Sequence, residues 1–430
     1  MKKYFLIVVL LWSFTGCKKE IEIASPVVTY QYPAENTVFE VLDTIRVNAD
    51  VTAAEEIGSF EVCLTNENLD PVLPSVSHLL LTGKSTLHID LLYPIDDIRL
   101  ESGNYFVLIS VKTAHSSKNK YQKIILHEYP RVLQGVLLIQ KANVNTTRLS
   151  LFTPDLIMKP LFLFPIDYGY SEIKSYDRTF YLGGKHVGDF YAFDLDSLVT
   201  RFNYCGYSGV NPAWVQGIGA EEGGVRLSTA DGLLTTYELS GKMKSSIKQV
   251  YPLYPTVSFV YNNYLLVNVL TLSGPESYLK SYYYPWGGSY QTKQLNFTIL
   301  KMFSPRAGEV LMFGNTSGQA VLNVYYPETQ TLWAPLNNVP GKIIDVCQAD
   351  SKNYLIATTT GVYWYQYQTQ TLTLFASVTG TVGLCFEDLS KRLLIATSQD
   401  LKICSFPESQ LVTTITLTDS LEAISLLYNK

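Results

Sequence analysis

The sequence predicts an all-β protein in which a small β-sandwich precedes a larger unit of repeated four-stranded sheets. The first observation is compositional: 31 tyrosines stand against only 5 histidines and 5 methionines, and aromatic residues favour strands over helices. The second is that short apolar or alternating runs, separated by turn residues, recur along the chain. The third is a repeat of about 42 residues in the second part of the chain, described below.

The overall composition is that of a folded protein. The 430 residues are 47% hydrophobic and 17% charged, which excludes disorder for most of the chain. The 33 basic and 38 acidic side chains give a formal net charge of −5. Because proteins that bind nucleic acid usually carry a basic patch for the phosphate backbone, we expect no nucleic-acid partner.

The N-terminus has the pattern of a secretory signal. Residues 1–16 begin with Lys2 and Lys3, continue through the apolar run 5–12 and end on small residues. Such a run is too short to span a bilayer, which takes about 20 residues.

Thr15 and Gly16 directly precede Cys17, and this segment resembles the lipobox of bacterial lipoproteins, with Phe14 where leucine is usual. The resemblance implies that Cys17 is lipidated and anchors the protein. Because Lys18 rather than aspartate follows, it also implies sorting to the outer membrane. A plain signal peptide with an incidental cysteine is the alternative.

Residues 17–26 are polar and then contain a proline, as expected of a tether. Residues 27–128 then show strand patterns at 43–51, 58–64, 85–92, 103–112 and 120–126, a spacing typical of a sandwich. Gly103 and Tyr105 open the fourth of these after a turn, and this segment resembles the penultimate strand of immunoglobulin-like and fibronectin-like modules. The resemblance implies an immunoglobulin-like domain.

Residues 131–430 are periodic. Strands that end on an aromatic residue recur at intervals of about 42 residues, at Phe152, Phe193, Tyr237, Tyr284, Tyr326, Tyr367 and Phe406. An apolar strand that runs into a small or polar turn precedes most of them, as at 354–361 and 392–400. Seven such units, each with room for four strands, predict a seven-bladed β-propeller.

The first and last units of this array are incomplete. The first unit, residues 134–165, has room for three strands, and residues 421–428 supply one further strand at the C-terminus. Pairing between them would close the ring and remove two exposed sheet edges, so we expect this closure. Several separate sandwiches, the alternative, would leave the last strand unexplained. Trp333 and the turn before it look like a kelch blade, but the other units lack that pattern.

Motifs for catalysis or metal binding are missing from the sequence. It contains no HExxH, CxxC or GxSxG motif, so we expect no metal, no cofactor and no catalytic residue. His186 is the one histidine of the periodic region. After Cys17 an odd number of scattered cysteines remains, which excludes a complete disulfide framework. We expect four of them to be core residues: Cys63, Cys347, Cys385 and Cys404.

A glycosidase needs two carboxylates across one cleft, and acids from different repeats could converge in this way. Adjacent acids occur in the periodic region as Glu221 with Glu222 and Glu387 with Asp388. Because neighbours on a strand point to opposite faces, neither pair suits one cleft. A propeller hydrolase therefore stays the third hypothesis.

Aromatic residues cluster instead in two connections between repeats. Tyr207 and Trp214 lie in one connection, and Tyr251 and Tyr254 lie in the next. Since such connections emerge on one face of a propeller, we expect these four residues to form a ligand-binding surface. The alternative is that they pack between the blades. A second cluster at 282–290 is expected on the opposite face.

The sequence thus favours a non-catalytic, lipid-anchored outer-membrane protein whose loop face binds a glycan or peptide, similar to accessory lipoproteins of nutrient uptake. The second hypothesis is a scaffold whose aromatic patches bind other envelope proteins. A large exposed apolar patch would favour the scaffold, whereas a concave pocket with converging polar groups would favour a ligand.

Overall fold

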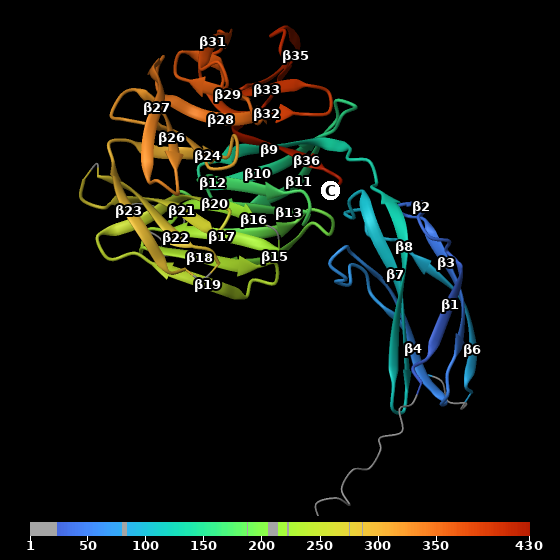
Figure 1. Cartoon of the computed structure of the whole chain (residues 1–430). Coiled ribbons are helices and arrows are strands. Elements are labelled where there is room, and N and C mark those ends of the chain that lie inside the picture. The colour runs from blue at the N-terminus through green and yellow to red at the C-terminus, as the bar shows by residue number, and fades with distance from the viewer. Residues whose placement is uncertain are drawn as a thin grey trace, which may run out of the picture. The chain divides into compact units, whose positions relative to one another are not determined.

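The computed structural model describes residues 24–79, 84–186, 188–204, 214–221, 223–274, 276–285 and 287–430. All regular elements in these segments are β-strands (Figure 1). None of the described residues belongs to a helix long and apolar enough to cross a membrane. The chain divides into two compact units, Met1–Pro130 and Arg131–Lys430.

The smaller unit consists of two sheets that bury one apolar core. Alternation along its strands produces this core: in β3, Ile45, Val47 and Ala49 are buried while their neighbours are exposed or half-buried. One sheet has the order β1-β3-β6 and the other β2-β8-β7-β4-β5, with β2 parallel to β8. The strands are β1 Val27–Tyr32, β2 Thr37–Glu40, β3 Thr44–Thr52, β4 Ile57–Thr65, β5 Val76–Leu79, β6 Thr86–Pro94, β7 Gly103–Thr113 and β8 Ser117–His127.

The five strands expected in this unit are all present, with ends shifted by a few residues. The sequence pattern missed three further strands, β1, β2 and β5. Each of them pairs on one side only, at the edge of its sheet. They are also short, with 6, 4 and 4 residues, and each buries at most one side chain, so their hydrophobic alternation is weak.

The larger unit contains seven four-stranded sheets among its described residues, each antiparallel throughout. The first three sheets along the chain are β11-β10-β9-β36 (β9 Leu133–Asn143, β10 Thr146–Phe152, β11 Met158–Phe164, β36 Ser420–Tyr428), β12-β13-β14-β15 (β12 Tyr170–Lys174, β13 Thr179–Gly183, β14 Phe190–Asp194, β15 Val199–Tyr204) and β16-β17-β18-β19 (β16 Val215–Glu221, β17 Gly224–Thr229, β18 Leu233–Glu238, β19 Met243–Lys248).

In each of the remaining four sheets the strands pair in the order in which they occur along the chain. They are β20 to β23 (β20 Leu253–Tyr261, β21 Tyr264–Thr271, β22 Ser277–Tyr283, β23 Ser289–Leu295), β24 to β27 (β24 Thr298–Phe303, β25 Val310–Asn315, β26 Ala320–Tyr326, β27 Thr331–Val339), β28 to β31 (β28 Ile343–Asp350, β29 Asn353–Thr358, β30 Gly361–Gln366, β31 Thr371–Ala376) and β32 to β35 (β32 Thr381–Glu387, β33 Arg392–Thr397, β34 Asp400–Ser405, β35 Leu411–Thr416).

The first strands of successive sheets contact one another in a cycle. Contacts join β12 to β16, β20, β24, β28 and β32 in turn, then β32 to β36, and β36 back to β12. The second strands are buried almost throughout, as in β13 and β17, because neighbouring sheets cover both of their faces. This burial is the physical reason for the apolar runs that recur in the sequence. The all-β fold with repeated four-stranded sheets, consistent with a propeller, is confirmed.

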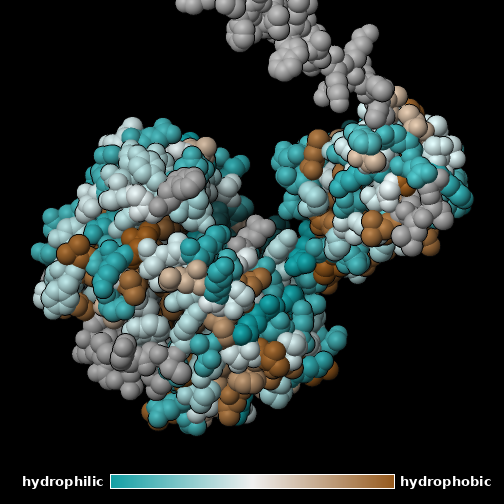
Figure 2. Space-filling view, turned by 90° about the horizontal axis from the view of Figure 1, so that it is seen from below, coloured by the Kyte–Doolittle hydropathy of each residue, from teal (hydrophilic) through white to brown (hydrophobic). Residues whose placement is uncertain are grey.

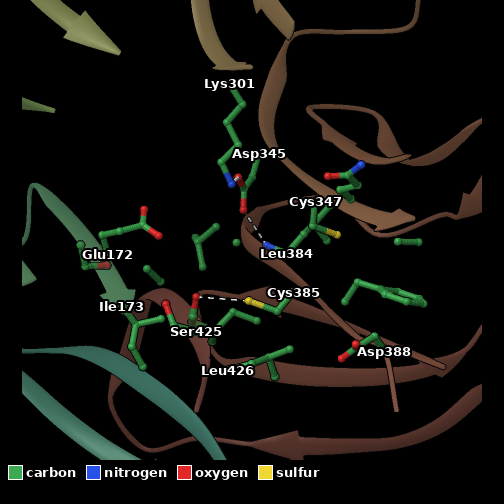
Figure 3. Close-up of a pocket in the computed structure, with 18 of the residues that line it drawn as sticks. Glu172, Ile173, Lys301, Asp345, Cys347, Leu384, Cys385, Asp388, Ser425 and Leu426 are labelled. Carbon is green, nitrogen blue, oxygen red and sulfur yellow. Dashed lines mark hydrogen bonds and ion pairs between the residues drawn. The ribbon is translucent and has the colours of Figure 1, made fainter. Parts of the chain in front are cut away.

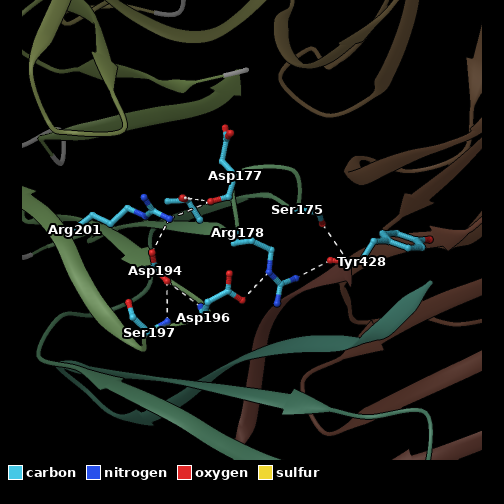
Figure 4. Close-up of polar contacts among 9 residues, drawn as sticks. Ser175, Asp177, Arg178, Asp194, Asp196, Ser197, Arg201 and Tyr428 are labelled. Carbon is cyan, nitrogen blue, oxygen red and sulfur yellow. Dashed lines mark hydrogen bonds and ion pairs between the residues drawn. The ribbon is translucent and has the colours of Figure 1, made fainter. Parts of the chain in front are cut away.

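The C-terminal strand β36 pairs with β9, the first strand of this unit (Figure 1). Side chains of the neighbouring sheet hold its end (Figure 4). The Arg178 Nη1 donates to the Tyr428 carbonyl at 2.7 Å, and the Tyr428 N–H donates to the Ser175 hydroxyl at 3.3 Å. The Arg131 guanidinium lies 3.6 Å from the centre of the Tyr428 ring. The two ends of the larger unit are therefore tied together.

Candidate functional site

A cavity of about 770 Å³ lies among the first strands of the sheets in the larger unit. Residues of β12, β24, β28, β32 and β36 line it. Figure 3 shows their side chains, with Lys301, Asp345 and Glu172 at one end. Its size falls within the range of about 300–1,000 Å³ that is typical of small-molecule sites.

Lys301 and Asp345 form an ion pair that connects three sheets. The Lys301 Nζ lies 2.6 Å from Asp345 Oδ1 and donates to the Val346 carbonyl at 2.8 Å. The Asp345 Oδ2 accepts from the Leu384 N–H at 2.8 Å. Although desolvation opposes the ammonium form, the nearby Asp345 and Glu172 carboxylates raise the pKa of Lys301 above its usual value. Lys301 is therefore a permanent cation of this cavity.

Glu172, on β12, is the carboxylate with spare capacity in the same cavity. Its partner among the described residues is the N–H of Ile173. Desolvation raises the pKa of Glu172 above its usual value, and the charge of Lys301 opposes that rise only in part. A carboxyl group that is half-buried and left with unused acceptor positions is suited to bind a donor that enters from outside.

The other acids of the cavity already have partners. Asp388 accepts from Arg131 at 2.8 Å and from the Tyr428 hydroxyl at 2.9 Å. Asp350 accepts from the N–H groups of Lys352 and Asn353 in the turn after β28. Glu172 is thus the carboxylate of this cavity that is least satisfied by the described residues.

Two cysteines line the cavity, which corrects one expectation from the sequence. Cys63 and Cys404 are buried, as expected of core residues, whereas Cys347 and Cys385 are half-buried and face the cavity. Burial raises the pKa of Cys385 to about 12, and the pKa of Cys347 is also raised by burial. Both are therefore neutral thiols rather than reactive thiolates. Both cysteines lie on strands that border the cavity, so their side chains are covered only in part. The pattern of apolar residues in the sequence does not show this.

A second cavity of about 360 Å³ shares Tyr168 with the first. Burial raises the pKa of Tyr168 to about 12. In the second cavity His186 lies with its Nδ1 2.6 Å from Asp167 Oδ2, and its side chain is 78% exposed. His186 is thus a paired but solvated loop residue.

The four aromatic residues expected to form a ligand-binding surface lie in different environments. Tyr207 lies outside the described residues. Trp214 is half-buried and packs against the apolar cluster between the sheets of β12 and β16, which is the packing alternative. Tyr251 is 83% exposed. Tyr254 is half-buried and lies close enough to Tyr170 for their hydroxyl groups to interact, and Tyr170 lines the cavity. The three described residues do not themselves line this cavity.

The described members of the sequence-adjacent carboxylate pairs each have partners of their own. Glu221 forms an ion pair with the buried Arg226, and Glu222 lies outside the described residues. Glu387 accepts from the backbone of Leu389 and Ser390 in a turn. Cys17, the expected lipidation site, also lies outside the described residues.

The second aromatic cluster consists of Tyr264, Tyr283 and Tyr290, with ring centres 5.1–6.1 Å apart. Tyr283 is 44% exposed. Figure 2 shows one face of the molecule, on which apolar residues form separate small patches among polar ones. No group of three or more histidine, cysteine or acidic side chains that could hold a metal ion occurs among the described residues.

No protein-family model and no curated protein matches this sequence. Solved structures are similar at low identity. A quinoprotein alcohol dehydrogenase-like protein from Bacteroides thetaiotaomicron has a TM-score of 0.48 and 13% identity, over 94% of this chain and 99% of that one. A chain of the mitotic checkpoint complex has 0.48 and 11%, over 60% and 79%. A computationally designed protein, Ika8, has 0.45 and 11%, over 67% and 90%. These TM-scores and sequence identities are too low for the similarities to indicate a function.

One feature of the sequence indicates the cavity residues. Glu172, Lys301 and Asp345 are charged residues in the first strands of their repeats, and Lys301 and Asp345 have apolar neighbours on both sides. A charged side chain on an inner strand must face either a hydrogen-bond or ion-pair partner or a cavity. Alignment of the repeats by strand would have placed all three residues on the inner strands.

Proposed function

We propose that this chain is a lipid-anchored cell-envelope protein that binds a neutral saccharide in its central cavity. The proposal takes the larger unit as a seven-bladed β-propeller closed by its C-terminal strand, and the smaller unit as an immunoglobulin-like module that carries it. The lipobox-like segment that ends in Cys17 supports the anchor and an outer-membrane location.

The architecture is supported by the arrangement of the seven four-stranded sheets. Their first strands contact one another in a cycle, and β36 completes the sheet of β9. The two-layered packing of the smaller unit supports the immunoglobulin-like assignment. A rigid ring with a central cavity is a platform for binding, and the ligand is determined by the side chains inside.

One observation carries the choice of ligand: the same cavity is lined by a carboxylate with unused acceptor positions and by an ammonium group with an unused donor. Glu172 has unused acceptor positions, and the third N–H of Lys301 has no partner among the described residues. A cationic ligand would meet Lys301, and an anionic one would meet Glu172 and Asp345. A hydroxyl group both donates and accepts, so a neutral polyhydroxylated ligand satisfies both groups.

The test compares Glu172→Gln with Glu408→Gln, a change at an exposed glutamate outside the cavity. Calorimetric titration of the full chain, in a detergent without a sugar headgroup, would use cellobiose, maltose, xylobiose and N-acetylglucosamine. We expect one of these sugars to bind and Glu172→Gln to weaken its binding at least about tenfold, because a hydrogen bond to a charged group is lost. Equal binding by both variants, or no binding of any of the sugars, would contradict the proposal.

A glycoside hydrolase is the second candidate, because the cavity brings together Glu172, whose pKa is raised, and Asp345. A carboxyl group whose pKa is raised holds its proton to a higher pH than a free glutamic acid does, which is a property of general acids. Release of p-nitrophenol from p-nitrophenyl glycosides, absent in Glu172→Gln, would support this function. A chain that binds a sugar without turnover would leave the binding proposal in place.

A further inference from the structure

A groove of about 530 Å³ lies between the sheets of β24 and β28, apart from the central cavity. Its walls come from the turns after β24, β28 and β30 and from the adjoining ends of β26 and β27. These turns leave the sheets at the end opposite to the connections that carry Trp214 and Tyr251, because successive strands are antiparallel. The groove is therefore a separate region of the larger unit.

Two aromatic side chains are presented in this groove. Trp333 is 41% exposed, although it lies on a strand, and Tyr326 beside it is half-buried. An exposed indole has an unfavourable contact with water unless a ligand covers it. A flat aromatic surface with polar groups around it is suited to stack against the C–H face of a sugar ring.

One buried carboxylate holds the wall of the groove in place. Glu309, with 6% of its side chain exposed, accepts two hydrogen bonds from Arg306, at 2.7 and 2.6 Å. It also accepts from the Tyr367 hydroxyl, and Tyr326 is a further partner. Three of the side chains that line the groove are thus oriented by a single residue behind them. Such preorganisation is typical of a binding site and is not needed at a solvated surface.

The charge of the groove is opposite to that of the cavity. Its described lining residues include Arg306 and Lys352 but no carboxylate. Glu309 engages the Nε and Nη2 atoms of Arg306, while the Nη1 hydrogens have no partner among the described residues. Gln368 and Gln370 add exposed amide groups along the same wall. The groove therefore offers donors, a net positive charge and an aromatic face.

We infer that this groove binds an anionic saccharide, a sugar chain that carries carboxylate groups. The aromatic face of Trp333 would stack on a sugar ring, Arg306 and Lys352 would bind the carboxylates, and Gln368 would bind hydroxyl groups. The preference for a saccharide over another flat anion rests on the proposed envelope function. The site itself does not depend on the central cavity.

The experiment titrates the full chain, in a detergent without a sugar headgroup, with hexagalacturonic acid, with neutral cellohexaose and with adenosine monophosphate. We expect hexagalacturonic acid to bind and the other two not to. Trp333→Ala and Lys352→Met should each weaken that binding about tenfold or more, and added salt should weaken it further. Preferential binding of adenosine monophosphate, equal binding of cellohexaose, or no binding of any probe would overturn the inference.

Matched controls separate the groove from a general effect of aromatic residues or charge. Tyr251→Ala removes an aromatic residue that is 83% exposed elsewhere, and Lys244→Met removes an exposed lysine of β19. Both variants should bind hexagalacturonic acid as the unmodified chain does. Loss of binding in a control equal to that in its partner variant would overturn the assignment to the groove.

The same titration in Glu172→Gln distinguishes the two proposals. We expect binding of hexagalacturonic acid to be unchanged in this variant, because Glu172 does not line the groove. If the central cavity fails to bind any neutral sugar, the result for the groove stands on its own. Loss of hexagalacturonic acid binding in Glu172→Gln would show that the acid binds in the cavity, and the inference would be wrong.

Discussion

Glu172, half-buried in the central cavity, and Glu309, buried behind the surface groove, are both carboxylates of the larger unit, yet their pKa values shift in opposite directions. Desolvation is the largest influence on each, and it raises the pKa of both. For Glu309 the hydrogen bonds from Arg306 and Tyr367 outweigh desolvation, so its pKa is lowered. For Glu172 the influence of Lys301 does not suffice, and its pKa is raised.

The two carboxylates differ in which groups supply their hydrogen bonds. The chain itself supplies the partners of Glu309, which therefore stabilises the fold and positions other side chains. The partners of Glu172 are incomplete within the described residues and its pKa is raised, so its ionised form destabilises the folded protein. Because its charge lowers the stability of the folded protein, Glu172 is the stronger candidate of the two for direct contact with a ligand.

The largest effect on stability is expected from Lys301→Met, which leaves Asp345 and Glu172 in the cavity without their cation. Breaking a fully buried pair costs about 3–5 kcal/mol. Because 44% of the Lys301 side chain is accessible within the cavity, solvent reduces this cost, and we expect a loss of about 2–3 kcal/mol in the free energy of unfolding. Urea denaturation at neutral pH measures it. Lys301→Arg is the control, and an equal loss in that variant would show that packing rather than charge matters.

A smaller loss is expected from Glu309→Gln, about 1–2 kcal/mol, because the ion pair with Arg306 is lost and the Tyr367 hydroxyl no longer donates to a charged acceptor. The pKa of Glu309 is lowered from 4.5, so its contribution is present above about pH 4.5 and is lost as the pH falls through the folded-state pKa. Urea denaturation across this range should show the two proteins converging at acid pH. A difference that stays constant with pH would contradict the role of the charge.

The smallest effect, and one of opposite sign, is expected from Glu172→Gln. The pKa of Glu172 is raised from 4.5, so the unfolded chain loses its proton first and the folded state loses stability as the pH rises above about 4.5. The variant should therefore be slightly more stable than the unmodified chain at neutral pH and equal to it at acid pH. Thermal unfolding at both pH values measures this, with Glu408→Gln as the control. A destabilised Glu172→Gln at neutral pH would assign Glu172 to the fold rather than to a site.

Much of the fold could be predicted because its signals are local. The aromatic repeat and the apolar second strands were visible, since strands covered on both faces read as unbroken apolar runs. The pairing of β36 with β9 could also be predicted, because a lone strand needs a partner. The edge strands β1, β2 and β5 were missed, because little of their surface is buried and the pattern that reveals a strand is burial itself.

The candidate sites were harder, for a different reason. The aromatic residues in the connections were predicted to form a binding surface, and of the described ones Trp214 is half-buried against the apolar cluster between two sheets while Tyr251 is 83% exposed. Hydrophobic side chains at a loop do not reveal whether a neighbouring sheet covers them. The sequence around Trp333 looks like a kelch blade, but only the packing of two sheets places Trp333 in a groove.

Three features of this protein follow from the order of its residues alone: the chain is all β, its second part repeats, and its last strand needs a partner. They follow because strand period and aromatic spacing depend on residues that are close in the sequence. Which charges meet depends instead on how the sheets pack. Glu172, Lys301 and Asp345 come from three different repeats, as do Arg306 and Lys352 from two. Distances between residues far apart in the chain are set by how sheets pack, and the electrostatic environment of a side chain depends on those distances.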